Sequence, residues 1–418
     1  MTLFKKISIK GVYWIYPIYL FICYIQARAW TTQVYPGDGI LIWPLRIFML
    51  LIGLKAFVVN AHKCIPLSLF FIYNVFSFIL YAFNGYPFSL YINDFVFYII
   101  PMTFAFVGLN SDLSDNFYKY TFISIIVFCV YGLYLYSVTP AWYQNAMVRI
   151  QTSKYWLQGL DVDFSYIQER IRFGSFLLTS YATEYFGLFA LPFSIVGIIK
   201  SRNKKEKSMY MIFTLIVFVS IILSMQRAAI LCSVLIIITL GFYDTIHKRK
   251  AIVFYLLGGI LVVLFLLNYT TSDLGLRVFE RFGDINLTAF SDRQYQSENL
   301  LSVWDNYIFG NGLGTGGNEA RKRGYLAATD ANYTKLLVEL GVFGFGLFIL
   351  LVLTTCLRIY KNFKYYAVEG AFIVSVLIAM LGSNALMFDF FIPPFWFCIG
   401  RVWNTQYLNK KKLEQDFI

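Results

Sequence analysis

Residues 209–246 read MYMIFTLIVFVSIILSMQRAAILCSVLIIITLGFYDTI, an apolar run that is broken at SMQR, residues 224–227. An α-helix rises about 1.5 Å per residue, and the hydrocarbon core of a bilayer is about 30 Å thick. The run is therefore too long for one membrane span and just long enough for two spans joined by a tight turn. We expect a helical hairpin here, with Gln226 and Arg227 at its tip.

The composition of the whole chain has the same apolar character. Of 418 residues, 59% are hydrophobic, 20% are aromatic and only 14% are charged, and the mean hydropathy is +0.63. A soluble domain is closer to half apolar and about a quarter charged. This chain has too little polar surface to cover a water-soluble globule of its size. The composition therefore predicts an all-α integral membrane protein that forms a single polytopic membrane domain.

Apolar runs long enough to cross a bilayer, about 17–24 residues each, recur along the sequence. We predict twelve membrane spans, at residues 12–29, 39–59, 65–83, 90–109, 117–138, 176–199, 209–226, 228–246, 251–268, 333–357, 367–385 and 387–404.

The positions of the basic residues predict the orientation of these spans. Lysine and arginine cluster in residues 5–10, 200–207, 248–250, 358–364 and 410–412. With twelve spans, all of these clusters fall on one side, which the positive-inside rule makes cytoplasmic. Both termini are then cytoplasmic. The net charge of +12 is a topology signal rather than a sign of nucleic-acid binding.

This topology places two large loops outside the cytoplasm, at residues 139–175 and 269–332. The second loop carries the glycine-rich stretch GNGLGTGG, residues 310–317, and several arginines, which are Arg277, Arg281, Arg293, Arg321 and Arg323. Arginine forks and free backbone N–H groups are typical partners of phosphate. The glycines follow no strand and open no βαβ unit, so we expect no dinucleotide site. They predict a tight turn after an amphipathic helix over residues 295–308.

Three arginines are candidate phosphate ligands. Arg172 lies where the first outer loop re-enters the membrane, and the alternative is an interfacial arginine that reaches the lipid headgroups. Arg227 lies at the hairpin tip. A cation at membrane depth costs about 2.5–3.5 kcal/mol, so it is a functional candidate by default; the alternative is a plain turn residue. Arg293 opens the helix expected over residues 295–308, and the alternative is a solvated surface charge.

Carboxylates are the candidate acids and bases of the outer face. Asp330 precedes the span at residues 333–357, where it can act as a general base or acid or simply cap the helix. Glu298 and Glu339 are weaker candidates for the same role. The two histidines, His62 and His247, fall on the cytoplasmic side, so no imidazole is available outside. No residues have metal-ligand spacing, and we expect neither a metal nor another cofactor.

Four segments, in this order and spacing, resemble the O-antigen polymerase and ligase superfamily of bacterial envelope enzymes. They are RFGSF at residues 172–176, SMQRAA at 224–229, FGNGLG at 309–314 preceded by Arg293 and Trp304, and LLVELGVFG at 336–344 preceded by Asp330, Asn332 and Tyr333. The resemblance covers about residues 165–350. Ligases of the superfamily carry a histidine where this chain has Asp330, and this difference favours the Wzy-type polymerase.

The resemblance implies a membrane glycosyltransferase of the GT-C type in the bacterial inner membrane. Such an enzyme would polymerise undecaprenyl-pyrophosphate-linked oligosaccharide repeat units into O-antigen or a related surface polysaccharide, at the periplasmic face and without a metal. A chain-length regulator is a possible partner. The implied pyrophosphate ligands are Arg172, Arg227 and Arg293, the implied base is Asp330, and the secondary candidates are Glu298, Asn332 and Tyr333.

Two other functions remain open from the sequence. One is the ligase that transfers finished polysaccharide to a lipid core, and the absence of an outer histidine counts against it. The other is a flippase or other transporter of lipid-linked oligosaccharide. Such transporters tend to carry charges within several membrane helices. Charge is concentrated here in the loops, the two outer loops among them, but Arg46 and Lys55 fall within the second predicted span.

Overall fold

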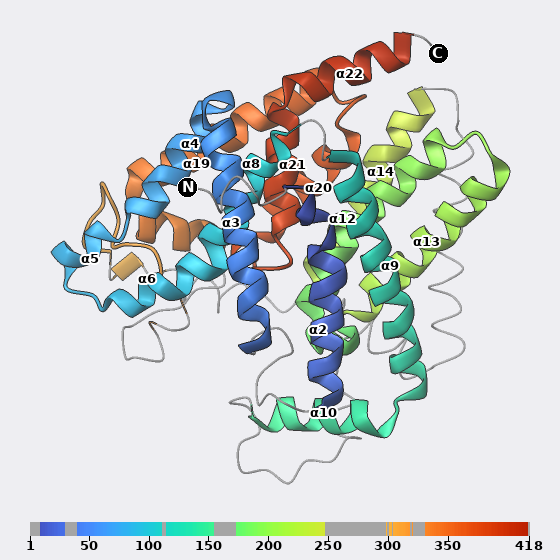
Figure 1. Cartoon of the computed structure of the whole chain (residues 1–418), viewed down its shortest axis with the longest axis horizontal. Coiled ribbons are helices and arrows are strands. Elements are labelled where there is room, and N and C mark those ends of the chain that lie inside the picture. The colour runs from blue at the N-terminus through green and yellow to red at the C-terminus, as the bar shows by residue number, and fades with distance from the viewer. Residues whose placement is uncertain are drawn as a thin grey trace. The chain divides into compact units, whose positions relative to one another are not determined.

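The computed structural model describes residues 9–29, 40–110, 114–153, 173–246, 298, 301–302, 304–317, 320 and 331–416. All regular elements in these ranges are helices (Figure 1). Six of the helical segments are long and apolar enough to cross a membrane, namely Ile40–Lys63, Phe88–Gly108, Asp115–Val138, Ser180–Lys200, Lys204–Leu223 and Asn332–Lys361. The chain is therefore an all-α protein with the helix lengths and composition of a multi-pass membrane protein.

The chain divides into two compact units. The first unit comprises Met1–Val12, Phe48–Asp115 and Ile285–Ile418, and the second comprises Tyr13–Ile47 and Asn116–Asp284.

The second unit contains α2 (Ile15–Ala29), most of α9 (Ser114–Val138), α10 (Ala141–Ser153), α12 (Ser180–Lys200), α13 (Lys204–Leu223) and α14 (Arg227–Ile246). Helix α12 packs on both α13 and α14. A Cβ atom added at Gly187 of α12 would lie 2.6 Å from the Ile221 side chain, so the missing side chain lets α12 and α13 approach closely. The expected hairpin is confirmed, because α13 ends at Leu223 and α14 begins at Arg227.

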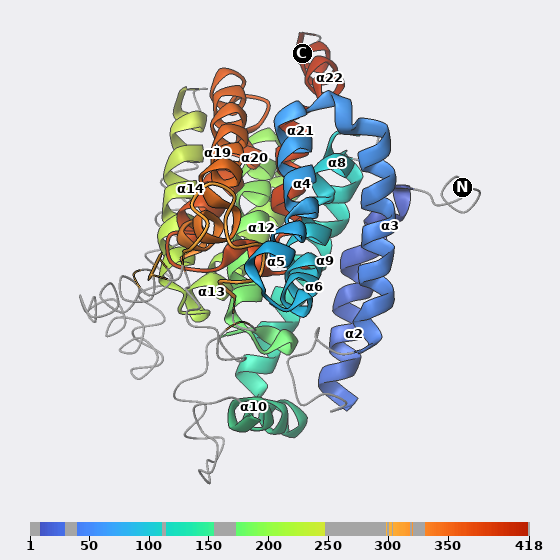
Figure 2. The ribbon, with the colours of Figure 1, turned by 90° about the vertical axis from the view of Figure 1, so that its left-hand side faces the viewer.

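The first unit contains most of α3 (Trp43–Asn60), then α4 (Ile65–Phe76), α5 (Ile79–Asn84), α6 (Phe88–Asp94), a π-helical turn (Phe95–Ile99), α7 (Ile100–Met102) and α8 (Phe104–Gly108). Its later part contains α19 (Asn332–Lys361), α20 (Ala367–Ala379), α21 (Pro393–Trp403) and α22 (Thr405–Asp416). Helix α21 packs on α8, and α19 packs on α4 (Figure 2).

The last two predicted spans are shorter than expected. Helix α20 has 13 residues and α21 has 11, because the segment between them folds into turns and the short 3-10 helix η7, Ala385–Met387. Helix α21 begins at the pair Pro393 and Pro394, residues that favour the first turn of a helix and cannot continue one from before. The predicted ninth span, residues 251–268, lies outside the described residues, as do residues 154–172 of the first outer loop.

The helix predicted over residues 295–308 ends early. Residues 304–306 are not helical, and residues 307–309 form a turn. The side chain of Asn311 accepts hydrogen bonds from the backbone N–H groups of Asp305 and Asn306, each at 3.2 Å, and the Asn306 side chain accepts from the Phe309 N–H at 3.0 Å. Such side-chain bonds satisfy the backbone outside a helix and so compete with helix formation.

Candidate functional site

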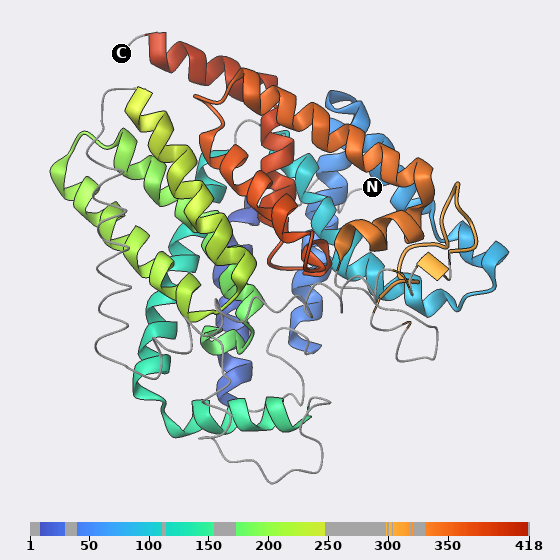
Figure 3. The ribbon, with the colours of Figure 1, turned by 180° about the vertical axis from the view of Figure 1, so that it is seen from behind.

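Helix α19 is broken at Gly341, whose backbone angles are φ 65° and ψ −178°. A break inside an apolar helix leaves backbone N–H and C=O groups without their usual partners, which is tolerated at membrane depth only where other protein groups replace them. In Figure 3 the segment of residues 304–317 lies beside the first part of α19. This segment supplies most of the replacements.

Four backbone hydrogen bonds and a tyrosine hydroxyl close the break. Backbone N–H groups of Asn311 and Gly312 donate to the carbonyls of Val338 and Glu339, both at 2.9 Å, and those of Val342 and Phe343 donate to the carbonyls of Tyr307 and Ile308 at 2.9 and 3.1 Å. The Tyr73 hydroxyl lies 2.8 Å from the Leu340 carbonyl oxygen. The glycine-rich loop, residues 310–317, and the broken helix are therefore one bonded structure.

The two backbone segments can approach this closely only because each carries a glycine at the crossing point. A Cβ atom added at Gly310 would lie 2.3 Å from the Glu339 carbonyl oxygen, and one added at Gly341 would lie 2.3 Å from the Ile308 carbonyl oxygen. Both glycines also have positive φ, 83° and 65°, a conformation that other residues rarely adopt. The sequence predicted only a tight turn here, whereas the glycines serve a contact with a distant segment.

Two tyrosines hold the glycine-rich loop from the other side. The Tyr73 hydroxyl lies 2.7 Å from the Phe309 carbonyl oxygen, and the Tyr81 hydroxyl donates to the Leu313 carbonyl oxygen. The Tyr81 ring lies directly against Gly312, where a Cβ atom would come within 2.7 Å of it. Helices α4 and α5 thereby fix the position of the loop.

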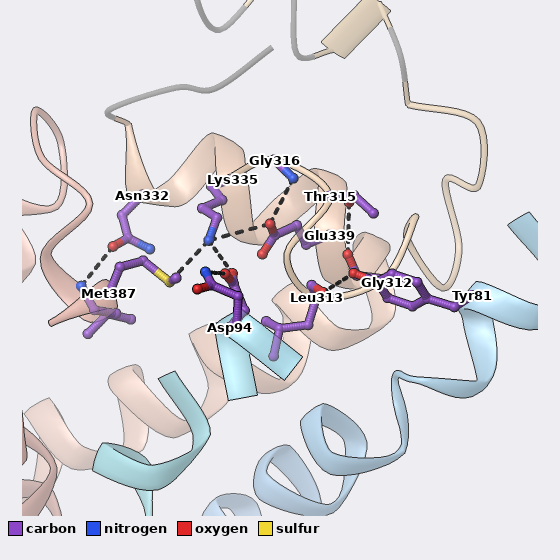
Figure 4. A network of polar contacts seen from close by, with 12 residues as sticks. Tyr81, Asp94, Gly312, Leu313, Thr315, Gly316, Asn332, Lys335, Glu339 and Met387 are labelled. Atoms are coloured by element: carbon purple, nitrogen blue, oxygen red, sulfur yellow. Dashed lines mark hydrogen bonds and ion pairs between the residues drawn. The ribbon is translucent and has the colours of Figure 1, made fainter. Parts of the chain in front are cut away.

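A buried ion cluster lies beneath the loop, and we define it as Asp94, Lys335 and Glu339 (Figure 4). The Lys335 ammonium nitrogen lies 2.6 Å from Asp94 Oδ2 and 3.4 Å from Glu339 Oε1. Its third close contact is the Met387 sulfur at 3.0 Å. The exposed fractions of the three side chains are only 2%, 1% and 0% in sequence order. The i,i+4 spacing of Lys335 and Glu339 places both on one face of α19.

The ion cluster is bonded to the loop as well as to the helices. The Gly316 N–H donates to Glu339 Oε1 at 2.9 Å, and a Cβ atom added at Gly317 would lie 3.6 Å from Asp94 Oδ1. Buried charges are costly unless they are paired and hydrogen-bonded. Pairing across α6, α19 and the loop offsets that cost and joins the three elements.

Asn332 and Tyr333, two of the secondary site candidates, anchor the start of α19. The Asn332 side-chain oxygen accepts from the Leu386 N–H at 2.9 Å, and its backbone N–H donates to the Met380 carbonyl at 3.1 Å. The Tyr333 hydroxyl donates to the Leu377 carbonyl at 2.8 Å. Asn332 therefore holds main chain of the segment that follows α20, and Tyr333 holds main chain in the last turn of α20 itself.

Arg227 is the first residue of α14 in the second unit, and its side chain is exposed; Glu298 is also exposed. Arg172, Arg293 and Asp330 lie outside the described residues. The shared binding of pyrophosphate by the three arginines stays a prediction.

Lys335 and Asp94 were missed as candidates. Both lie within predicted membrane spans, and an ionisable residue at membrane depth is by itself a signal of function. Lys335 also lies four residues before Glu339, a spacing that predicts an ion pair on a helix. Their pairing with each other joins positions 241 residues apart, which no local pattern reveals.

A second ionic cluster forms where α21 meets α22. The Arg401 guanidinium lies 2.8 Å from Glu369 Oε1 and 3.0 Å from Asp115 Oδ1, and it donates to the Tyr407 hydroxyl. Burial raises the pKa of the Tyr407 phenol, although the nearby Arg401 opposes this effect. The Arg358 guanidinium lies 3.8 Å from the centre of the Trp403 ring. The Tyr407 contact joins α21 to α22, and the other contacts join α21 to Asp115, α20 and α19.

Comparison of the sequence with models of known protein families and with curated protein sequences found no match.

Proposed function

We propose that this chain is a membrane glycosyltransferase of the GT-C type, a Wzy-type polymerase of undecaprenyl-pyrophosphate-linked oligosaccharide repeat units. In this proposal the chain crosses the bacterial inner membrane twelve times, with both termini in the cytoplasm. Residues 139–175 and 269–332 face the periplasm, where O-antigen or a related surface polysaccharide is built.

One observation carries the proposal beyond the resemblance in sequence. Two of the four resembling segments, residues 309–314 and 336–344, are hydrogen-bonded to each other across the break in α19. The intervening residues 318–330, which include Asp330, start next to the loop fixed by Glu339 and end next to the anchored Asn332. A reactive group is most effective when rigid elements position it. The bonded segments that precede and follow Asp330 in the sequence therefore support a site at this residue.

The proposed reaction transfers the growing glycan from its lipid pyrophosphate to a second lipid-linked repeat unit. The acceptor hydroxyl oxygen attacks the anomeric carbon, the bond from that carbon to the pyrophosphate oxygen breaks, and Asp330 takes the hydroxyl proton. Arg172, Arg227 and Arg293 neutralise the negative charge of the leaving undecaprenyl pyrophosphate. They thereby stabilise the transition state electrostatically without a metal. The product is longer by one repeat unit.

The test is a reaction of the purified full chain with lipid-linked repeat units. We expect a ladder of products that differ by one repeat. Asp330→Asn should abolish the ladder, and Arg227→Lys and Arg293→Lys should weaken it at least about tenfold, because lysine cannot form the bidentate fork. Lys361→Met, a change at an exposed residue of α19, is the matched control and should leave the ladder intact. A full ladder from both Arg→Lys variants would contradict the assigned role.

A transporter of lipid-linked oligosaccharide is the second candidate, and specific observations favour it. Helix α19 is discontinuous, and its buried charges resemble the arrangement of transporters with broken helices. Arg46 is also buried, with its guanidinium 5.0 Å from the centre of the Trp43 ring. Movement of lipid-linked repeat units across proteoliposomes without any ladder would favour this function over polymerisation.

A further inference from the structure

The ion cluster has an unbalanced charge. It contains two carboxylates, Asp94 and Glu339, and one ammonium group, Lys335, so full ionisation leaves one excess negative charge. All three side chains are almost completely buried, between α6, α19 and the glycine-rich loop. A net charge is costly in such a site within an apolar unit.

Only one of the four carboxylate oxygens of the ion cluster lacks a contact in the part of the chain that the structure describes. Asp94 Oδ2 faces the ammonium at 2.6 Å, and Asp94 Oδ1 accepts from the Asn93 side chain at 3.3 Å. Glu339 Oε1 accepts from the Gly316 N–H and faces Lys335. Glu339 Oε2 is buried and has no hydrogen-bond partner in the part of the chain that the structure describes. A buried acceptor without a partner needs a hydrogen-bond donor or a bound cation, and the excess negative charge of the cluster favours a cation.

The groups around Glu339 do not supply a compensating positive charge. From α5 and the π-helical turn, the neutral phenols of Tyr81 and Tyr98 lie within electrostatic range of both carboxylates. The thioether of Met387 contacts the ammonium, and the loop offers backbone N–H groups and the Thr315 hydroxyl, which donates to the Gly312 carbonyl. Among the described residues that contact the cluster, Lys335 is the only cation.

We propose that the ion cluster is a proton-binding site in which Glu339 carries one proton on Oε2. The proton comes from bulk water and returns to it, so no other reactant is needed. With it, the cluster has one ammonium, one carboxylate and one carboxylic acid, and no net charge. The site makes the packing of the glycine-rich loop on broken α19 dependent on pH. This inference does not rest on the proposed polymerase activity.

Infrared difference spectroscopy of the purified full chain in lipid discs tests the proposal. A protonated carboxyl group in a dry site has a C=O stretching band that is separate from carboxylate bands and shifts in deuterated water. We expect this band in the wild type at neutral pH, and its loss as the pH is raised. Glu339→Gln, which preserves shape, should remove it. The control Glu206→Gln, at an exposed position of α13, should keep it.

Two further variants test the charge count itself. Asp94→Asn removes the excess negative charge, so Glu339 should ionise as the partner of Lys335 and the band should disappear at neutral pH although Glu339 is still present. Lys335→Met removes the cation and should strengthen the band, because both carboxyl groups then bind protons.

Several outcomes would overturn the proposal. They are a wild-type spectrum without the band, a band that survives in Glu339→Gln, and a band that survives in Asp94→Asn. A wild-type carboxylate signal that responds to added sodium instead would assign the site to a metal cation. The wild-type titration and deuterium shift give a result even where a variant fails to fold.

Discussion

At the residue scale, single side chains hold main chain that has no helical partner. The Tyr81 hydroxyl donates to the Leu313 carbonyl, and both residues are buried. Tyr81→Phe keeps the ring against Gly312 but leaves this carbonyl without a donor. An unsatisfied buried acceptor costs about 1–3 kcal/mol. We expect a lower unfolding temperature in thermal unfolding of the detergent-purified protein.

The matched control for this change is Tyr360→Phe. Tyr360 lies on α19 and is 83% exposed, so removal of its hydroxyl should leave the unfolding temperature unchanged. Equal unfolding temperatures for Tyr81→Phe and Tyr360→Phe would mean that the tyrosine bond does not hold the loop.

The sequence predicted some of these residues as polar candidates but could not predict their contacts. Glu339 was recognised as a carboxylate of interest, and Asn332 and Tyr333 were recognised through a resembling segment. Asp94, Lys335 and Tyr81 were not, because each finds its partner on a distant element. Burial of a charge is decided by tertiary packing, which a single sequence does not encode locally.

At the scale of elements, the break in α19 arises from contact with another segment and not from the sequence of the helix alone. The hairpin of α13 and α14 could be predicted, because its apolar run exceeds the length of one span. The break could not, since Gly341, Gly344 and Gly346 look alike in an otherwise apolar helix. What distinguishes Gly341 is the main chain of residues 307–312 that crosses it.

Gly341→Ala should therefore destabilise the protein. A Cβ atom at this position meets the Ile308 carbonyl oxygen at 2.3 Å, and positive φ costs about 1–2 kcal/mol for residues other than glycine. We expect an unfolding temperature several degrees lower and faster proteolysis within residues 304–317.

Gly346→Ala is the control on the same helix. Nothing lies within 4 Å of a Cβ atom at Gly346, and alanine favours a helix by about 1 kcal/mol over glycine. This variant should be as stable as the wild type or more stable. If both alanine variants behaved alike, the crossing of the loop over α19 would be wrong.

At the scale of the whole molecule, the asymmetry of charge between the loops predicts the orientation in the membrane. The described helices bear out a multi-pass membrane protein, while the number of spans and the sides of the loops stay predictions. The short helices α20 and α21 make the last two spans the most demanding part of the twelve-span topology. Neither helix is long enough by itself to cross a bilayer. The two predicted spans can cross only if the turns between the helices supply the remaining length.

A reporter-fusion map tests this topology directly. Fusions after residues 203 and 364 should be cytoplasmic, because these positions lie in basic loops that the positive-inside rule retains. Fusions after residues 153 and 300 should be periplasmic, because both positions lie in the predicted outer loops. A fusion after residue 410 reports on α20 and α21 together and should be cytoplasmic. A cytoplasmic signal at residue 300 would place the glycine-rich loop and Asp330 in the cytoplasm. The proposed active site would then have no access to a lipid-linked substrate on the periplasmic face.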